Sequence, residues 1–274
     1  MSVQHYRSIW LSDLHLGTRG CQAEQVLDFL RHTESERLYL VGDIVDGWAL
    51  KRAWYWPQAH NDVVQKLLRK ARKGTQVVYV PGNHDDAARA FTGLAFGEME
   101  ITREAIHDTA DGSLFLVLHG DEFDGAVQLA PWLSHLGARA YERALALNTH
   151  LNGLRSRFGM PYWSLAGALK ARTKRAVQYV AGFEEAVARR ARERDVDGIV
   201  CGHIHKAELR TIGGKLYANC GDWVESCTAL VEHDAGRLEL VRWPHVPPTT
   251  ESAGDGLAYG EATLAVFPPS LWTP

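Results

Sequence analysis

Runs of apolar residues and segments of mixed polarity alternate along most of the chain. The uninterrupted apolar runs predict buried strands at 9–11, 37–41, 76–80, 114–118 and 198–201. Apolar residues that recur every three or four positions predict helices at 22–32 and 61–73. Buried strands separated by helices are typical of an α/β core whose strands are covered on both faces.

The pattern changes after residue 205. Apolar and polar residues alternate in four short segments, which predicts an antiparallel meander with strands at 208–212, 215–219, 227–233 and 237–243. From Pro244 onward the periodicity stops, and six of the ten prolines lie in this last segment. We expect 244–274 to be a loose or disordered tail.

Long helices are expected between 127 and 194. One predicted helix has an apolar face that repeats from Leu133 to Leu154, and a second has such a face from Ala176 to Ala191. The domain organisation is therefore expected to be a core over 1–126 and 195–243, a helical cap insertion over 127–194, and the tail over 244–274.

Each of the predicted core strands ends in a cluster of Gly, Asp, Asn or His. In α/β sheets functional groups collect at the carboxyl ends of strands, and glycines there let the backbone turn sharply. Asp13 and His15 are two residues apart, and residues two apart in an extended chain point to the same side. The candidate metal ligands at these strand ends are Asp13, His15, Asp43, Asn83, His119, His203 and His205.

The composition of this ligand set predicts two metal sites. A turn, a helix cap or a buried histidine explains any one of these residues more simply, but their joint occurrence at separate strand ends favours ligands. They are too many for one ion, and clustering them without cations would be costly. Oxygen and imidazole ligands without thiolate suit Mn²⁺, Fe²⁺ or Zn²⁺ better than Ca²⁺, and Mn²⁺ is the cation we expect.

Five motifs carry a family resemblance: Asp13-x-His15, Gly42-Asp43-x-x-Asp46, Gly82-Asn83-His84-Asp85, His119-Gly120-Asp121 and Gly202-His203-x-His205. In this order they resemble the calcineurin-like metallophosphoesterase superfamily. The resemblance implies a four-layer αββα sandwich of the α/β (α+β) class with two divalent metal ions. It also implies a first metal site of Asp13, His15, Asp43 and His205. The implied second site, which shares Asp43 as a bridge, is Asp43, Asn83, His119 and His203.

Four more residues have expected roles beside the metals. His84 is not needed as a ligand, so it can face the substrate and stabilise the transition state or protonate the leaving oxygen. Catalytic and metal-ligand imidazoles are usually held by carboxylates. We therefore expect Asp85 to orient His84, and Asp46 and Asp121 to orient metal-ligand histidines.

The insertion contains a candidate substrate surface. The stretch from Arg143 to Phe183 contains seven Lys or Arg and several aromatic residues but no Asp or Glu. It is either the solvated basic face of a helical hairpin or a surface for an anionic, partly apolar substrate. A Trp-rich loop after Asp43 either lines the same cleft or packs on the core. The candidate substrate-binding residues are Trp48, Arg155, Arg157, Tyr162, Trp163, Lys170 and Lys174.

A narrower resemblance concerns the segment from Gly42 to Trp48 together with Trp54-Tyr55-Trp56-Pro57 and His60-Asn61-Asp62. This set resembles one branch of the UDP-2,3-diacylglucosamine diphosphatase group. The resemblance implies that the protein cleaves UDP-2,3-diacylglucosamine to UMP and 2,3-diacylglucosamine 1-phosphate in lipid A biosynthesis. In the best-known branch an Arg stands in place of His84. Two alternatives stay open: a broader soluble phosphodiesterase or phosphomonoesterase acting on nucleotides or other esters, and a non-catalytic scaffold that keeps the fold.

The overall composition indicates the class of protein and its expected location in the cell. The chain has 274 residues, of which 46% are hydrophobic and 23% charged, as in ordinary soluble globular proteins. A net charge of −3 does not favour nucleic-acid binding. The four cysteines form no Cys-x-x-Cys pair, and we recognise neither a leader nor a membrane-spanning segment. We expect a cytoplasmic protein that contacts the cytoplasmic face of the inner membrane peripherally.

Overall fold

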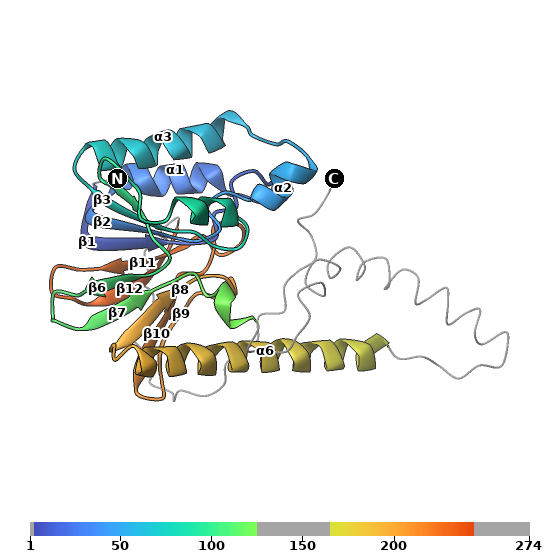
Figure 1. Ribbon diagram of the computed structural model, residues 1–274. Coiled ribbons are helices and arrows are strands. Elements are labelled where there is room, and N and C mark those ends of the chain that lie inside the picture. The colour runs from blue at the N-terminus through green and yellow to red at the C-terminus, as the bar shows by residue number, and fades with distance from the viewer. Residues whose placement is uncertain (1–2, 125–164, 244–274) are drawn as a thin grey trace, which may run out of the picture. The chain divides into compact units, whose positions relative to one another are not determined.

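The computed structural model describes residues 3–124 and 165–243, and two β-sheets form its centre (Figure 1). The larger sheet has the strand order β12-β11-β1-β2-β3-β5-β4. Strands β1, β2, β3 and β5 are parallel, and β4, β11 and β12 pair antiparallel with their neighbours. The bounds are β1 Gln4–Leu11, β2 Thr33–Val41, β3 Gln76–Val80, β4 Ala95–Phe96, β5 Met99–Ile101, β11 Thr228–Glu232 and β12 Leu238–Arg242.

The smaller sheet has the strand order β6-β7-β8-β10-β9. Its middle strands β7, β8 and β10 are parallel, and its edge strands β6 and β9 are antiparallel to them. The bounds are β6 Ala105–Asp108, β7 Leu114–Val117, β8 Gly198–Cys201, β9 Glu208–Ile212 and β10 Lys215–Asn219. The carboxyl ends of β1, β2 and β3 from one sheet and of β7 and β8 from the other carry the predicted metal ligands.

The last four strands do not form the single meander that their alternation predicts. β9 and β10 pair within the smaller sheet, whereas β11 and β12 pair within the larger sheet. β10 joins β8 in parallel, so the chain changes sheet between Asn219 and Thr228. Alternation along a strand reflects which of its faces is buried and does not identify its neighbour, so the prediction found the strands and gave the wrong pairing.

Helices cover the outer faces of both sheets. α1 (Ala23–His32) and α3 (Gln58–Arg72) lie on the larger sheet, where Val26, Leu30 and Leu67 are buried (Figure 1). α6 (Leu165–Glu193) belongs to the same compact unit as the sheets from Val180 onward, and this part buries Phe183, Val187 and Ala191. The resulting layers are those of the expected αββα sandwich. None of the described helices has the length and apolarity that a membrane crossing requires.

The cap insertion over 127–194 stays a prediction, and the end of α6 from Val180 belongs to the same compact unit as the sheets. The expected helical face from Leu133 to Leu154 and the expected tail over 244–274 lie outside the described residues. Trp48 lies in a short helix, α2 (Gly47–Arg52), and not in a loop. Asp46 caps this helix by accepting a hydrogen bond from Ala49 N at 2.7 Å.

A buried polar network joins the two sheets behind the site. His107 of β6 lies 2.9 Å from the hydroxyl of Tyr39 in β2 and 2.9 Å from the carboxylate of Glu232 in β11. All three side chains are buried, and Trp10 packs edge-on against the imidazole. Burial lowers the pKa of His107, although Glu232 acts in the opposite direction. The folded protein therefore favours neutral His107.

This network predicts a pH-dependent stability. The pKa of His107 is lower in the folded than in the unfolded chain, so the unfolded chain takes up this proton first as the pH falls below about 6.5. The stability that neutral His107 contributes is present above that pH and is lost as the pH falls toward the folded pKa. Urea unfolding should show a larger loss of unfolding free energy between about pH 7.5 and 5.5 for wild type than for His107→Gln. Equal losses in both proteins would contradict this.

Candidate metal centre

The loops after β1 and β2 run side by side and carry three of the predicted ligands. Asp13 N donates to Gly42 O at 3.0 Å, and His15 N donates to Asp43 O at 2.9 Å. Leu16 and Val45 then form an isolated parallel bridge. The two parallel strands thus continue past their formal ends as a backbone ladder, which fixes the position of the ligand side chains.

Most of the ligand residues have a left-handed backbone. The φ angles are 53° for Asp13, 51° for His15, 54° for Asp43, 70° for His203 and 53° for His205. Asp13 and His15 converge because of these turns and not, as the sequence suggested, because they alternate along an extended strand, which ends at Leu11. Such conformations cost about 1–3 kcal/mol each and gather at functional sites. Five of the seven non-glycine residues with positive φ in the described ranges are predicted ligands.

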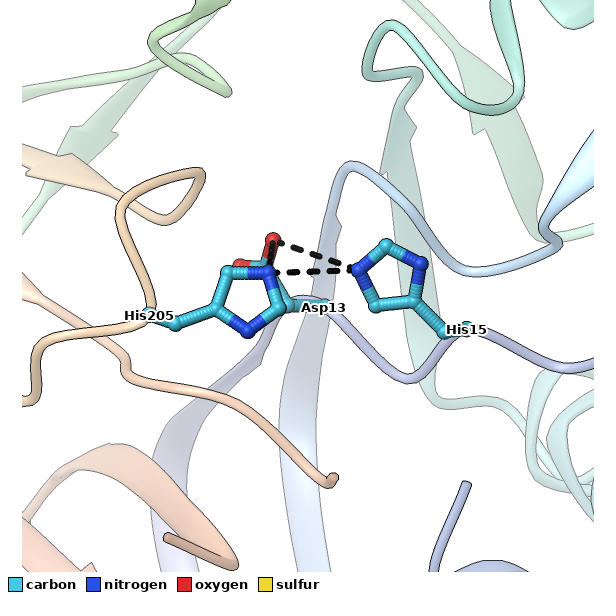
Figure 2. Close-up of side chains that lie close together, drawn as sticks. All are labelled: Asp13, His15 and His205. Carbon is cyan, nitrogen blue, oxygen red and sulfur yellow. Dashed lines mark hydrogen bonds and ion pairs between the residues drawn. The ribbon is translucent and has the colours of Figure 1, made fainter. Parts of the chain in front are cut away.

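Asp13, His15 and His205 form the first ligand group (Figure 2). The Nε2 atoms of His15 and His205 lie 3.2 Å apart, and Asp13 Oδ1 lies 3.2 Å from His205 Nε2 and 4.0 Å from His15 Nε2. The other oxygen, Asp13 Oδ2, accepts a hydrogen bond from His203 N at 3.0 Å. One carboxylate oxygen and two imidazole nitrogens therefore point at one another, as ligands of one cation do.

Asp43, His119 and His203 form the second group. His119 Nδ1 donates to Val41 O at 3.0 Å, which leaves Nε2 directed toward Asp43 Oδ1 at 3.4 Å. His203 Nε2 lies 2.8 Å from Asp124 Oδ1. Sequence reasoning did not single out Asp124, because nothing in the sequence indicates which carboxylate reaches the ring of His203. A carboxylate on one ring nitrogen is a common partner of a metal-bound imidazole.

Asp43, a member of the second group, also faces the first. Its Oδ2 is 3.9 Å from His15 Nε2, and its Oδ1 is 3.4 Å from His119 Nε2. Each oxygen of this buried carboxylate thus faces a different ligand group. This is the arrangement that a carboxylate bridging two cations requires.

The donor atoms fit divalent cations. Three atoms of predicted ligands, Asp13 Oδ1, Asn83 Oδ1 and His119 Nε2, are among the buried polar atoms of the described residues that make no hydrogen bond. Buried polar atoms are nearly always paired, and leaving them unpaired costs free energy. Two carboxylates, an amide oxygen and imidazole nitrogens are ligands of Mn²⁺, Fe²⁺ and Zn²⁺. The residues present therefore fit the group that the sequence predicts.

The electrostatics of the site favour positive charge. Burial alone would lower the pKa of His119, but the carboxylates of Asp43, Asp13 and Asp121 together raise that pKa to about 10. In the same way Asp13 raises the pKa of His205 to about 9 against the effect of burial. Burial acts to raise the pKa of Asp43, yet the surrounding imidazoles hold it well below its usual range. The carboxylates that retain protons on these rings would equally stabilise bound cations.

His84 lies beside the two groups and is held by Asp46. His84 Nδ1 is 3.0 Å from Asp46 Oδ2, and His84 Nε2 is 4.0 Å from Asp43 Oδ2. Asp46 Oδ2 also accepts a hydrogen bond from His15 Nδ1 at 3.1 Å, a contact that restrains this imidazole. Burial opposes protonation of His84, but Asp46 and Asp43 raise its pKa.

Asp85 and Asp121 have partners other than those expected. Asp85 accepts hydrogen bonds from Ile44 N at 2.8 Å, Gly82 N at 2.5 Å and the Tyr79 hydroxyl at 2.5 Å. It therefore fixes the loop backbones after β2 and β3. Asp46 takes the place beside His84. Asp121 pairs with Arg89 at 2.7 Å, and not with a metal-ligand histidine.

The predicted substrate-binding residues are only partly described. Trp48 lies against His84, with ring centroids 4.2 Å apart. The other six lie outside the described residues or, for the two lysines, in the part of α6 whose side chains are not described: Arg155, Arg157, Tyr162, Trp163, Lys170 and Lys174.

The close packing at Gly42 leads to a test of the site. A Cβ at Gly42 would overlap the imidazole of His119. Gly42→Ala should therefore displace a ligand, and metal analysis after reconstitution should find fewer than two ions per chain. Gly74→Ala is the matched control, because Gly74 also has a positive φ but no heavy atom within 4 Å of the added carbon. The control should lose only about 1–2 kcal/mol of stability and retain its metal. Full metal occupancy in Gly42→Ala would contradict the proposed geometry.

Comparison with known proteins finds distant structural neighbours and one family match. Vps29 from Entamoeba histolytica in complex with zinc is similar at 17% identity, with 86% of this chain and 97% of that chain covered and a TM-score of 0.40. YfcE, a phosphoesterase from E. coli, is similar at 14% identity, with 85% and 97% covered and a TM-score of 0.41. No curated protein sequence matches the chain. The family model of the calcineurin-like phosphoesterases matches residues 6–207, a range that includes every predicted ligand. The chain therefore belongs to the calcineurin-like phosphoesterase family, whose members are metal-dependent hydrolases of phosphate esters.

Proposed function

We propose that the protein is a dinuclear phosphoesterase that hydrolyses the pyrophosphate bond of UDP-2,3-diacylglucosamine, giving UMP and 2,3-diacylglucosamine 1-phosphate. The observation that carries the dinuclear chemistry is the position of Asp43, which directs one oxygen to each ligand group. Two divalent cations held there would neutralise charge on the phosphoryl oxygens and acidify an attacking water. We expect Mn²⁺, with Fe²⁺ or Zn²⁺ as other candidates, because the ligands are oxygen and imidazole atoms.

His84 is the group in this chain best placed to move a proton. Its Nδ1 lies 3.0 Å from Asp46 and its Nε2 lies 4.0 Å from Asp43, the carboxylate shared by the two predicted metal sites. The adjacent carboxylates raise its pKa and favour the protonated ring. A protonated His84 can donate to the leaving oxygen, a contribution of about 10²–10⁴ in rate for a general acid.

The substrate proposal is supported by the sequence of the insertion and by the motif around Trp48. A basic and aromatic stretch without carboxylates suits a phosphorylated headgroup that carries acyl chains. The same chemistry favours peripheral contact with the cytoplasmic face of the inner membrane, whereas the net charge of −3 gives no reason to expect a nucleic-acid partner.

A second candidate function is a phosphodiesterase or phosphomonoesterase of broader range, acting on nucleotides or other esters. His84 favours it, because the best-known diphosphatase branch has an Arg at this position. A non-catalytic scaffold is a weaker candidate, because the full set of predicted ligands and His84 is present in the sequence.

Product analysis with purified, Mn²⁺-loaded protein tests the proposal. We expect UMP and 2,3-diacylglucosamine 1-phosphate in equal amounts from UDP-2,3-diacylglucosamine. Treatment with a chelator should abolish release, and added Mn²⁺ should restore it. Hydrolysis of simple diesters without release of UMP would reject the lipid substrate in favour of the broader phosphoesterase. Absence of hydrolysis of any ester by metal-loaded protein would reject both.

A further inference from the structure

We propose that Trp48 is a positioning residue for His84, acting as a wall that holds the imidazole in its productive orientation and not as a substrate contact. The proposal rests on the function proposed above, in that it assigns His84 to the reaction. It also changes the role that the sequence suggested for Trp48, which was to bind substrate.

The start of α2 is fixed directly against His84 through the backbone. Gly47 N donates to His84 O at 2.9 Å, and a Cβ at Gly47 would lie 2.9 Å from the same oxygen. Asp46, one residue earlier, caps α2 and also lies 3.0 Å from His84 Nδ1. These two independent contacts place Trp48, the residue after Gly47, next to His84.

The indole of Trp48 lies over the imidazole of His84. The ring centroids are 4.2 Å apart and the planes are inclined by 33°. His15 meets His84 edge-on, at 4.8 Å and 88°. With Asp46 at Nδ1, the ring is bounded on several sides, and rotation of His84 away from Asp43 would have to displace the indole.

Burial indicates what the indole does. α2 has no buried residue, and Trp48 itself is 38% exposed, so this ring is not an anchor for the hydrophobic core. The side chain of His84 is only 13% exposed. The Trp48 ring stacks at a tilt on His84 and thereby covers one face of the imidazole. Small misplacements of a catalytic group lower turnover strongly, which makes such a wall useful.

A double-mutant cycle with a small chromogenic diester separates the two roles. Bis(p-nitrophenyl) phosphate has no acyl chains or sugar for Trp48 to recognise. With Mn²⁺-loaded protein, Trp48→Ala should lower kcat about 10-fold and change KM less than about 2-fold. Trp48→Phe, which retains a ring, should stay close to wild type. In a His84→Asn background, the further change Trp48→Ala should alter kcat less than about 2-fold, because the residue acts through His84. Metal content should be unchanged in every variant.

A spectroscopic measurement makes the test independent of turnover. The ring protons of His84 should be shifted upfield in the NMR spectrum by the indole and should move downfield in Trp48→Ala. Lys51→Ala, an exposed change on the same helix, is the control and should alter neither spectrum nor kcat.

Three results would overturn the proposal. Trp48→Ala could raise KM equally with and without His84, which would make Trp48 a substrate contact. The His84 signals could stay in place in Trp48→Ala, which would mean that the rings do not stack. His84→Asn could leave kcat unchanged, which would remove the group that Trp48 is meant to position. Failure of the proposed function itself is distinguishable, because wild type would then release no UMP from UDP-2,3-diacylglucosamine, whereas the diester kinetics and the His84 shift would persist.

Discussion

The site depends on one buried carboxylate. Asp43 follows the end of β2, and its two oxygens face imidazoles that come from different sheets, His15 from the larger and His119 from the smaller. Two sheets that pack face to face bring several strand ends into one place. Only a carboxylate that faces ligands from both sheets can join these ligands into a single centre. The charge of Asp43 is stabilised there by the surrounding imidazoles despite its burial. Removal of that charge would leave two separate and incomplete ligand sets.

The backbone brings the ligands together through strained conformations and through glycines that let side chains approach it closely. Five predicted ligands adopt left-handed conformations, which L-residues avoid unless their surroundings impose them. Glycines leave the space that the ligand side chains occupy: a Cβ at Gly42 would overlap His119, and one at Gly202 would overlap Asp13. Asp85 then ties the loops after β2 and β3 together through Ile44 N and Gly82 N. The geometry of the metal centre is thus built into the loops and not into the strands that precede them.

Much of the fold was predictable because central strands of the sheets, such as β8, are buried on both faces. The apolar runs gave β3 and β8 with their observed bounds, and the candidate ligands were recognisable because they follow such runs. The strand partners of β10 and β11 were not predictable, because alternation does not encode them. The partner of His84 was also missed. Proximity in sequence favoured Asp85, whereas Asp46 reaches the ring from the neighbouring loop. Such errors arise where a tertiary contact determines which of two equivalent carboxylates pairs with a histidine.

The central claim is that Asp43 joins two metal sites into one centre. Metal analysis of reconstituted wild type and Asp43→Ala, with unfolding curves to verify that both are folded, tests it most directly. The account predicts two divalent ions per chain in wild type. In folded Asp43→Ala it predicts loss of metal from both sites, with fewer than one ion per chain after gel filtration. A single ion in wild type, or two ions retained by folded Asp43→Ala, would contradict it.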